Sequence, residues 1–218
     1  MPKPVEPSSL EPVCLRATKW LTTYSHEDGD LVKLFFVPVL SRAVHYQRIT
    51  GYFDSNALAL AARGLNGLIE NGGRMECIVG CTLDPEEVDH IENGYALRPL
   101  IAKGLHRRLQ LHAESEWNRQ RLGWLAWMIA HGHLDIKVAV PKGPDGRYHA
   151  GHGLYHAKSG LVTDAAGDRL VFRGSINETH AGWTQNCESF DVSCSWRGEY
   201  DLERIDKSEA EFGRLWRN

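Results

Sequence analysis

Two short segments decide the fold of this chain: Tyr155-His156-Ala157-Lys158 and Gly174-Ser175-Ile176-Asn177-Glu178-Thr179. A histidine and a lysine two positions apart on a β-strand point to the same face of the sheet. The second segment closes a following apolar run, so its hydroxyl and carboxamide come beside the histidine and the lysine. The pattern therefore predicts a polar site at neighbouring strand ends, built from His156, Lys158, Ser175 and Asn177.

These side chains suit attack on a phosphodiester. A neutral imidazole nitrogen of His156 can attack phosphorus and form a phosphohistidine, which water later hydrolyses. The ammonium of Lys158 and the donors of Ser175 and Asn177 would bind the nonbridging oxygens, which gain negative charge in the transition state. Gly174 lets the backbone approach closely. Taken singly, each feature has an ordinary interpretation as a strand histidine, a solvated lysine or a turn, and only their combination favours catalysis.

The two segments, together with Asn186-Cys187-Glu188, resemble the phospholipase D superfamily. The resemblance implies an α/β fold with a mixed, mostly parallel β-sheet flanked by helices on both faces. It also implies a metal-independent phosphodiesterase that needs no cofactor. Glu188 stands where a glutamate of the family accepts the second N–H of the histidine and fixes its tautomer. An exposed loop glutamate is the alternative interpretation.

The sequence departs from the family pattern His-x-Lys-x-x-x-x-Asp at one position. Thr163 stands where the aspartate belongs, and Asp164 follows one residue later. A shift of one residue on a strand reverses the face to which the side chain points. Asp164 can therefore replace the aspartate only through a bulge or at the end of the strand, and a structural role is expected for it.

The motif occurs once, whereas the two-motif members of the superfamily use one histidine to attack and another to protonate the leaving oxygen. The resemblance therefore implies a homodimer in which two copies of His156 face each other across a twofold axis. General acid catalysis by the second histidine is worth roughly 10²–10⁴-fold.

A longer string of residues favours DNA as the substrate. The segment from 154 to 191, with Gly182-Trp183 and Glu188-Ser189-Phe190-Asp191, resembles the nuclease module of bacterial helicases and of restriction or phage-defence proteins. In that group a terminal Phe-x-x-Leu-Trp, as in 212–216, often leads into a motor domain, so a fused or associated helicase is expected. Two alternatives stay open: a degenerate module that binds nucleic acid without cutting it, and a phosphodiesterase for lipids or small molecules.

Side chains outside the motif give weaker signals. Lys103, Arg107 and Arg108 are candidate contacts to a phosphate backbone, although a solvated helix face explains them slightly better. His149, His152 and His156 have a spacing that suggests a metal site. No acidic or cysteine ligand accompanies them, so no metal is expected.

Composition narrows the class of protein. The chain has 218 residues, 42% of them hydrophobic, and a formal net charge of −3. This charge gives no global signal for nucleic acid, so any such contact must come from a local patch. The five cysteines form no CxxC pair, and no window approaches the roughly twenty apolar residues of a membrane span. A cytoplasmic protein is expected.

Apolar periodicity predicts the order of the elements. Residues 1–12 are expected to be a flexible lead, and residues 13–218 a single domain with a helical insertion around 84–132. A β-α-β unit over 46–81 indicates parallel pairing. The remaining helices are expected over 30–46, with a kink or early stop at Pro38, and over 201–216. Further strands are expected over 134–140, 154–162, 169–175 and 190–196.

Overall fold

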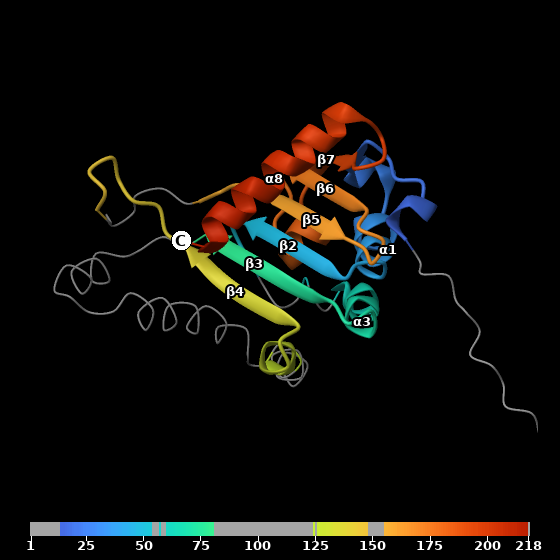
Figure 1. Ribbon diagram of the computed structural model, residues 1–218, viewed down its shortest axis with the longest axis horizontal. Helices are drawn as coiled ribbons and strands as arrows, with labels where there is room; N and C mark the ends of the chain where they lie inside the picture. Colours follow the sequence, from blue (N-terminus) through green and yellow to red (C-terminus); the bar gives the residue numbers. More distant parts are fainter. Residues whose placement is uncertain are drawn as a thin grey trace, which may run out of the picture.

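A computed structural model describes residues 14–53, 57, 60–80, 124, 126–147 and 155–217. Within these residues the chain forms one seven-stranded sheet with the strand order β1-β7-β6-β5-β2-β3-β4 (Figure 1). The strands are β1 (Thr23–Ser25), β2 (His45–Thr50), β3 (Arg74–Gly80), β4 (Leu134–Ala139), β5 (Ser159–Thr163), β6 (Arg169–Gly174) and β7 (Ser189–Cys194).

The sheet is mixed, as predicted, but the prediction that it is mostly parallel is wrong. β2 pairs with β3, and β3 with β4, in parallel. The pairings β1–β7, β7–β6, β6–β5 and β5–β2 are all antiparallel. For β5 and β6 the cause is their connection, a tight turn over 164–168, because a short connection can join only antiparallel neighbours.

The β-α-β unit predicted over 46–81 is present as β2, α3 (Ala62–Glu70) and β3. β2 and β3 pair in parallel, with Ile49 opposite Ile78. The helix ends where expected, because the Asn71 side chain donates to the backbone carbonyls of Ser41 and Ala43, in the connection between α1 and β2, and Gly72 adopts a φ of 70°. This unit carries the strand end at which the candidate site is built.

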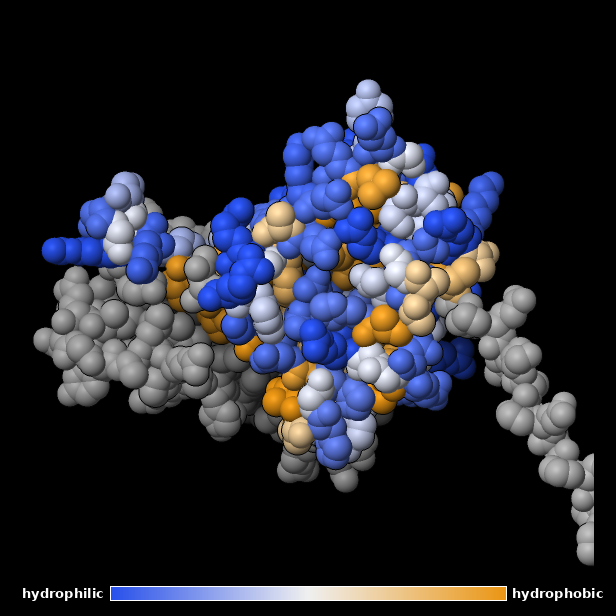
Figure 2. Space-filling view, in the orientation of Figure 1, coloured by the Kyte–Doolittle hydropathy of each residue, from blue (hydrophilic) through white to orange (hydrophobic). Residues whose placement is uncertain are grey.

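Helices cover both faces of the sheet, as predicted. On one face α8 (Glu199–Arg217) packs Phe212 against Ile49 and Ile78, and Ile205 against β5 and β6. Its outward side is hydrophilic (Figure 2). The opposite face carries the main core, where Phe36 stacks on Trp183 with ring centroids 4.0 Å apart. Its helices are η3 (Val32–Phe36), α1 (Val37–Leu40), α3 and α7 (His180–Thr184), and two short turns, η1 (Leu15–Ala17) and η2 (His26–Asp28), precede them.

The helix predicted over 30–46 ends early. The chain passes through the π-helical turn of η3 into α1, which has Pro38 in its first turn and stops at Leu40. Tyr46 lies in β2 instead, fully buried against the main core. Tyr46, Arg48 and Thr50, at every second position of β2, point to the core side of the sheet. The sequence therefore changes from helical spacing to strand alternation at residue 45.

β5 begins at Ser159, later than the strand predicted over 154–162. His156 and Lys158 therefore lie in the irregular segment before the strand, and strand alternation does not orient them. The ladder ends here because β6 ends at Gly174, whose N–H donates to Lys158 O at 3.3 Å, and the next residue, Ser175, turns to bond Ser189 O.

Some predicted features lie outside the described residues: the lead over 1–12 and most of the insertion around 84–132. The described end of that insertion is helical over 126–130 and stops at Gly132, which adopts a φ of 75°. No helix among the described residues is long and apolar enough to cross a membrane.

Candidate active site

The candidate site lies where three segments meet: the end of β2, the segment before β5 and the turn after β6. Gly51 follows β2, and an ideal Cβ at this position would lie 2.6 Å from His156 Cδ2 and 3.4 Å from Asn177 Oδ1. A side chain at residue 51 would clash with the imidazole, so glycine is required for this close approach. The structure thus brings His156 and Asn177 together, although 21 positions separate them in the sequence.

His156 presents its side chain to solvent. Its ring packs edge-on against Tyr52, with centroids 5.9 Å apart and planes at 87°. Within the described part of the chain, no hydrogen bond holds either ring nitrogen. Both nitrogens are accordingly open to a reacting group, which a nucleophile requires.

Lys158 lies partly buried beside His156. Its Nζ donates to the backbone O of His156 at 3.2 Å. Burial lowers the pKa of the ammonium below the ordinary 10.5, the carboxylate of Glu188 acts to raise it, and the guanidinium of Arg48 adds to the lowering. The lysine is therefore a partly desolvated cation, which interacts more strongly with a phosphate oxygen than a fully hydrated one.

Asn177 is held by its oxygen and keeps its nitrogen available. Oδ1 accepts from the Tyr52 N–H at 3.2 Å and lies 3.4 Å from the Thr50 hydroxyl. Because a backbone N–H can only donate, this bond fixes which end of the carboxamide faces β2. No described residue accepts from Nδ2, so this donor is left for a ligand.

Ser175 and Gly174 are both tied to β7. The exposed Ser175 hydroxyl accepts from the Ser189 N–H at 3.2 Å and lies 3.4 Å from the Ser189 carbonyl oxygen. A Cβ on Gly174 would lie 2.1 Å from that same oxygen. The close approach that was predicted for Gly174 is therefore made to the neighbouring strand.

Glu188 lies next to Lys158 in electrostatic terms, but the structure does not join it to the histidine. Its Oε1 accepts from Asn186 Nδ2 at 3.0 Å, and its N–H donates to His26 Nδ1 at 3.1 Å. Among the described residues no hydrogen bond links Glu188 to His156. The role of Glu188 in orienting the histidine remains a prediction.

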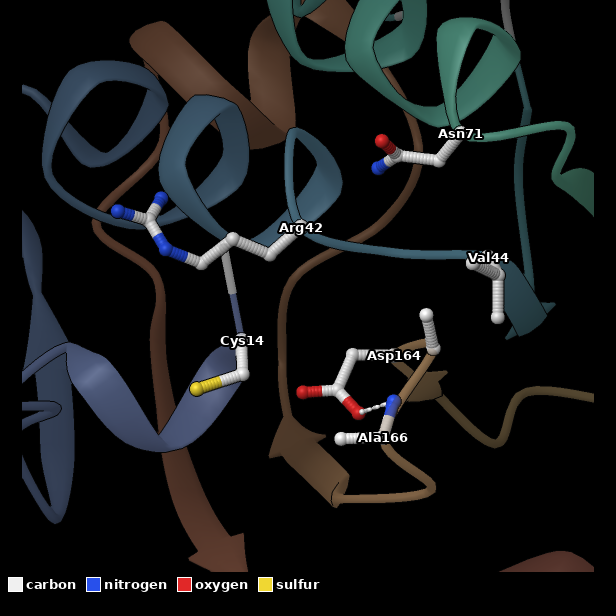
Figure 3. Close-up of a pocket in the computed structure, with 7 residues that line it drawn as sticks. Cys14, Arg42, Val44, Asn71, Asp164 and Ala166 are labelled. Carbon is white, nitrogen blue, oxygen red and sulfur yellow. Dashed lines mark hydrogen bonds between the residues drawn. The ribbon is translucent and has the colours of Figure 1, made fainter. Parts of the chain in front are cut away.

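Asp164 stands at the end of β5, at the far end of the strand from His156. Its carboxylate accepts from the backbone N–H groups of Leu15, Ala166 and Asp168, at 2.7, 2.9 and 2.9 Å. The side chain is 3% exposed and borders a cavity of about 120 Å³ (Figure 3). Asp164 thus holds the β5–β6 turn against η1 at Leu15, which is a structural role away from the site.

Sequence reasoning missed the charged pair directly beneath the site. Arg48 and Thr50 alternate in the sequence with Ile49, Gly51 and Phe53, a pattern that predicts a polar strand face, yet both side chains are fully buried. Arg48 Nε lies 2.8 Å from Glu178 Oε2, and both side chains are 0% exposed. The sequence did contain a clue to this burial: Arg48 is two positions after Tyr46 in the strand, so both side chains point to the same face of the sheet. Reading it required knowing that helices cover that face.

The residues that were predicted to contact a phosphate backbone, Lys103, Arg107 and Arg108, lie outside the described residues, and so do His149 and His152.

Comparisons with known proteins give structural matches only. No family model and no curated protein matches the sequence. Among solved structures the chain is similar to NucT from Helicobacter pylori, with a TM-score of 0.50 and 14% identity over 89% of this chain and 94% of that one. It is also similar to Nuc from Salmonella typhimurium, a phospholipase D family member, with a TM-score of 0.45 and 12% identity over 89% and 92% of the two chains. Phosphatidylserine synthase from Haemophilus influenzae Rd KW20 matches with a TM-score of 0.47 and 16% identity over 88% of this chain and 37% of the synthase.

Proposed function

We propose that the chain is a phosphodiesterase of the phospholipase D type whose nucleophile is His156, a proposal supported by the motif resemblance and by a fold similar to that of NucT from Helicobacter pylori. One observation carries the proposal: the His156 ring and the Asn177 carboxamide both border the space above Gly51, 2.6 and 3.4 Å from the position of a Cβ there, and the Lys158 ammonium bonds the His156 backbone oxygen. A nucleophile, a neutral donor and a desolvated cation at one strand end are the groups that phosphoryl transfer needs.

The reaction proceeds in two displacements. A neutral nitrogen of His156 attacks phosphorus, so that a P–N bond forms, the P–O bond to the leaving group breaks, and the leaving oxygen takes a proton from an acid. Water then attacks the phosphohistidine, the P–N bond breaks, and the conjugate base of that acid takes a proton from the water. Lys158 Nζ and Asn177 Nδ2 bind the nonbridging oxygens in both steps.

The acid is assigned to a second copy of the chain. His156 is exposed, and within the described residues no proton donor is bonded to its ring. We therefore propose a homodimer in which the partner's His156 protonates the leaving oxygen and later activates water.

DNA is proposed as the substrate. Tyr52 is 52% exposed and packs edge-on against the His156 ring, so its own ring would lie beside a phosphate bound at His156. Stacking of a nucleobase on an aromatic side chain is worth about 1–3 kcal/mol per base. The resemblance of the motif string to modules of bacterial helicases and of restriction or phage-defence proteins supports a cytoplasmic role in DNA processing with a helicase.

The decisive experiment is cleavage of single- and double-stranded DNA in excess EDTA by wild type and by His156→Ala. Cleavage should survive EDTA, and the substitution should lower kcat by at least about 10³-fold. His131→Ala is the matched control, because His131 is an exposed histidine at the opposite end of the sheet, bonded to Trp127 O. If His156→Ala cleaves DNA as fast as wild type, His156 is not the nucleophile.

One observation favours a second candidate function, a nucleic-acid-binding module that does not cut. Within the described chain no carboxylate is bonded to the His156 ring, so its tautomer is not fixed. DNA binding without cleavage by a dimeric wild type would select this alternative.

A further inference from the structure

A network of buried side chains fastens the turn over 176–178 to β2. Every second residue from Tyr46 to Tyr52 contributes to it. The Tyr46 hydroxyl lies 3.2 and 3.3 Å from the two oxygens of Glu178, and Thr50 Oγ1 accepts from the Glu178 N–H at 3.0 Å. The Tyr52 N–H bonds Asn177 Oδ1. The turn that carries the catalytic carboxamide is therefore anchored along the length of one strand.

Arg48 is the centre of the network. Its Nε donates to Glu178 Oε2 at 2.8 Å, and its Nη2 donates to Ile176 O at 2.5 Å. The guanidinium carbon lies 5.0 Å from the centre of the Phe172 ring. That ring in turn occupies the space over Gly160, where a Cβ would lie 2.2 Å from it. The planar fork of arginine thus grips both the carbonyl before Asn177 and the carboxylate after it.

Energetics argue against stability as the purpose of this pair. Both side chains are fully buried, and among the described residues Arg48 Nη1 has no hydrogen-bond partner. Burying two charges carries a large desolvation cost, and apolar replacements of similar volume are often neutral or stabilising. Burial and the Glu178 charge also raise the pKa of Tyr46, which marks the surroundings as dry. The pair must then serve something that an apolar pair would not provide.

We propose that Arg48 and Glu178 are positioning residues, which fix the turn over 176–178 so that Asn177 Nδ2 faces the phosphate bound at His156. The proposal rests on the proposed function and adds to it a second layer of residues that touch no substrate. Arg48 and Glu178 act only through the backbone and side chain of Asn177, so their loss should change kcat more than KM.

The test compares wild type with the double variant Arg48→Met/Glu178→Met and with the milder Glu178→Gln. Melting temperature, the NMR signals of the Asn177 side-chain amide, and kcat and KM on a DNA oligonucleotide are measured for each. We expect the double variant to melt within a few degrees of wild type, to shift or broaden the Asn177 signals, and to lose at least tenfold in kcat with KM changed less than threefold. Arg169→Met, which removes a surface ion-pair centre at the far end of β6, is the control and should leave both readouts unchanged.

Two results would overturn the positioning role: a stable double variant with wild-type Asn177 signals, or a Glu178→Gln variant whose signals and kcat are both those of wild type. Should the wild type cut no phosphodiester at all, the proposed function fails, and the NMR comparison still decides the positioning role separately.

Discussion

At the scale of single residues, Gly51 is a position where added volume would act directly on the His156 ring. We predict that Gly51→Ala lowers kcat by about 10²-fold or more, because the new methyl group would lie 2.6 Å from His156 Cδ2 and must displace the ring. Steady-state kinetics on DNA with circular dichroism as a folding check would measure this. Gly213→Ala is the control, since only the flexible end of Arg217 lies within 3.4 Å of the added group. A Gly51→Ala enzyme with wild-type activity would show that the His156 ring can move away from the methyl group without loss of function.

The charge of Lys158 is expected to promote catalysis and, at the same time, to lower the stability of the folded protein. Its pKa is lowered by burial, so its charge destabilises the folded state below that pKa, and the penalty fades as pH rises towards 10.5. We predict that Lys158→Met loses about 10²–10³-fold in kcat yet melts higher than wild type at pH 7, with the gain vanishing at alkaline pH. In wild type, activity should begin to fall on the alkaline side below pH 10.5. Melting curves and rates from pH 6 to 11 would test this.

The control for this comparison is Lys33→Met, which replaces an exposed lysine that pairs with Asp30. A Lys158→Met protein that is less stable than wild type at pH 7 would mean that the charge is a net stabilising contact.

At the scale of elements, the β5–β6 turn depends on one carboxylate. We predict that Asp164→Ala lowers the free energy of unfolding by about 2–4 kcal/mol, because three backbone N–H groups lose a charged acceptor in a nearly closed environment. Urea unfolding measures the loss, and kcat of the folded fraction should be unchanged. Asp206→Ala, whose side chain is 61% exposed, should cost less than about 1 kcal/mol. A lower kcat for the folded fraction of Asp164→Ala would show that Asp164 contributes to the active site.

Elements with a clear period were predictable, and elements set by long-range contacts were not. The β-α-β unit and α8 follow from apolar spacing within each segment. β1 was missed, because three residues carry no period and the strand exists only by pairing with β7. The start of β5 was misplaced, because the ladder ends where β6 turns towards β7, which no local pattern encodes.

The candidate site shows the same division. His156 and Asn177 could be brought together from their places before the first and after the second of two successive apolar runs. The pair Arg48–Glu178 could not, because a charged residue in a strand is normally assigned to solvent, and its burial follows from helices that pack across the sheet.

At the scale of the whole molecule, catalysis is expected to require two chains. We predict that specific activity falls on dilution in parallel with the dimer fraction measured by sedimentation, because each site borrows its acid from the partner's His156. A monomer that keeps full activity at all concentrations would place the acid within the same chain.

The boundary between β2 and β5 also separates the site residues into two groups that come from different parts of the sequence. Gly51, Tyr52 and Arg48 come from the part before residue 80, whereas His156, Lys158 and Asn177 come from the part after residue 126. The halves meet through antiparallel pairing of His45 to Ile49 with Ser159 to Thr163, and through the parallel pairing of β3 with β4. Neither half alone holds a nucleophile together with the glycine that makes room for it. Two fragments produced separately would therefore be inactive until they reassemble. Recovery of cleavage on mixing them would show that β2 has paired with β5.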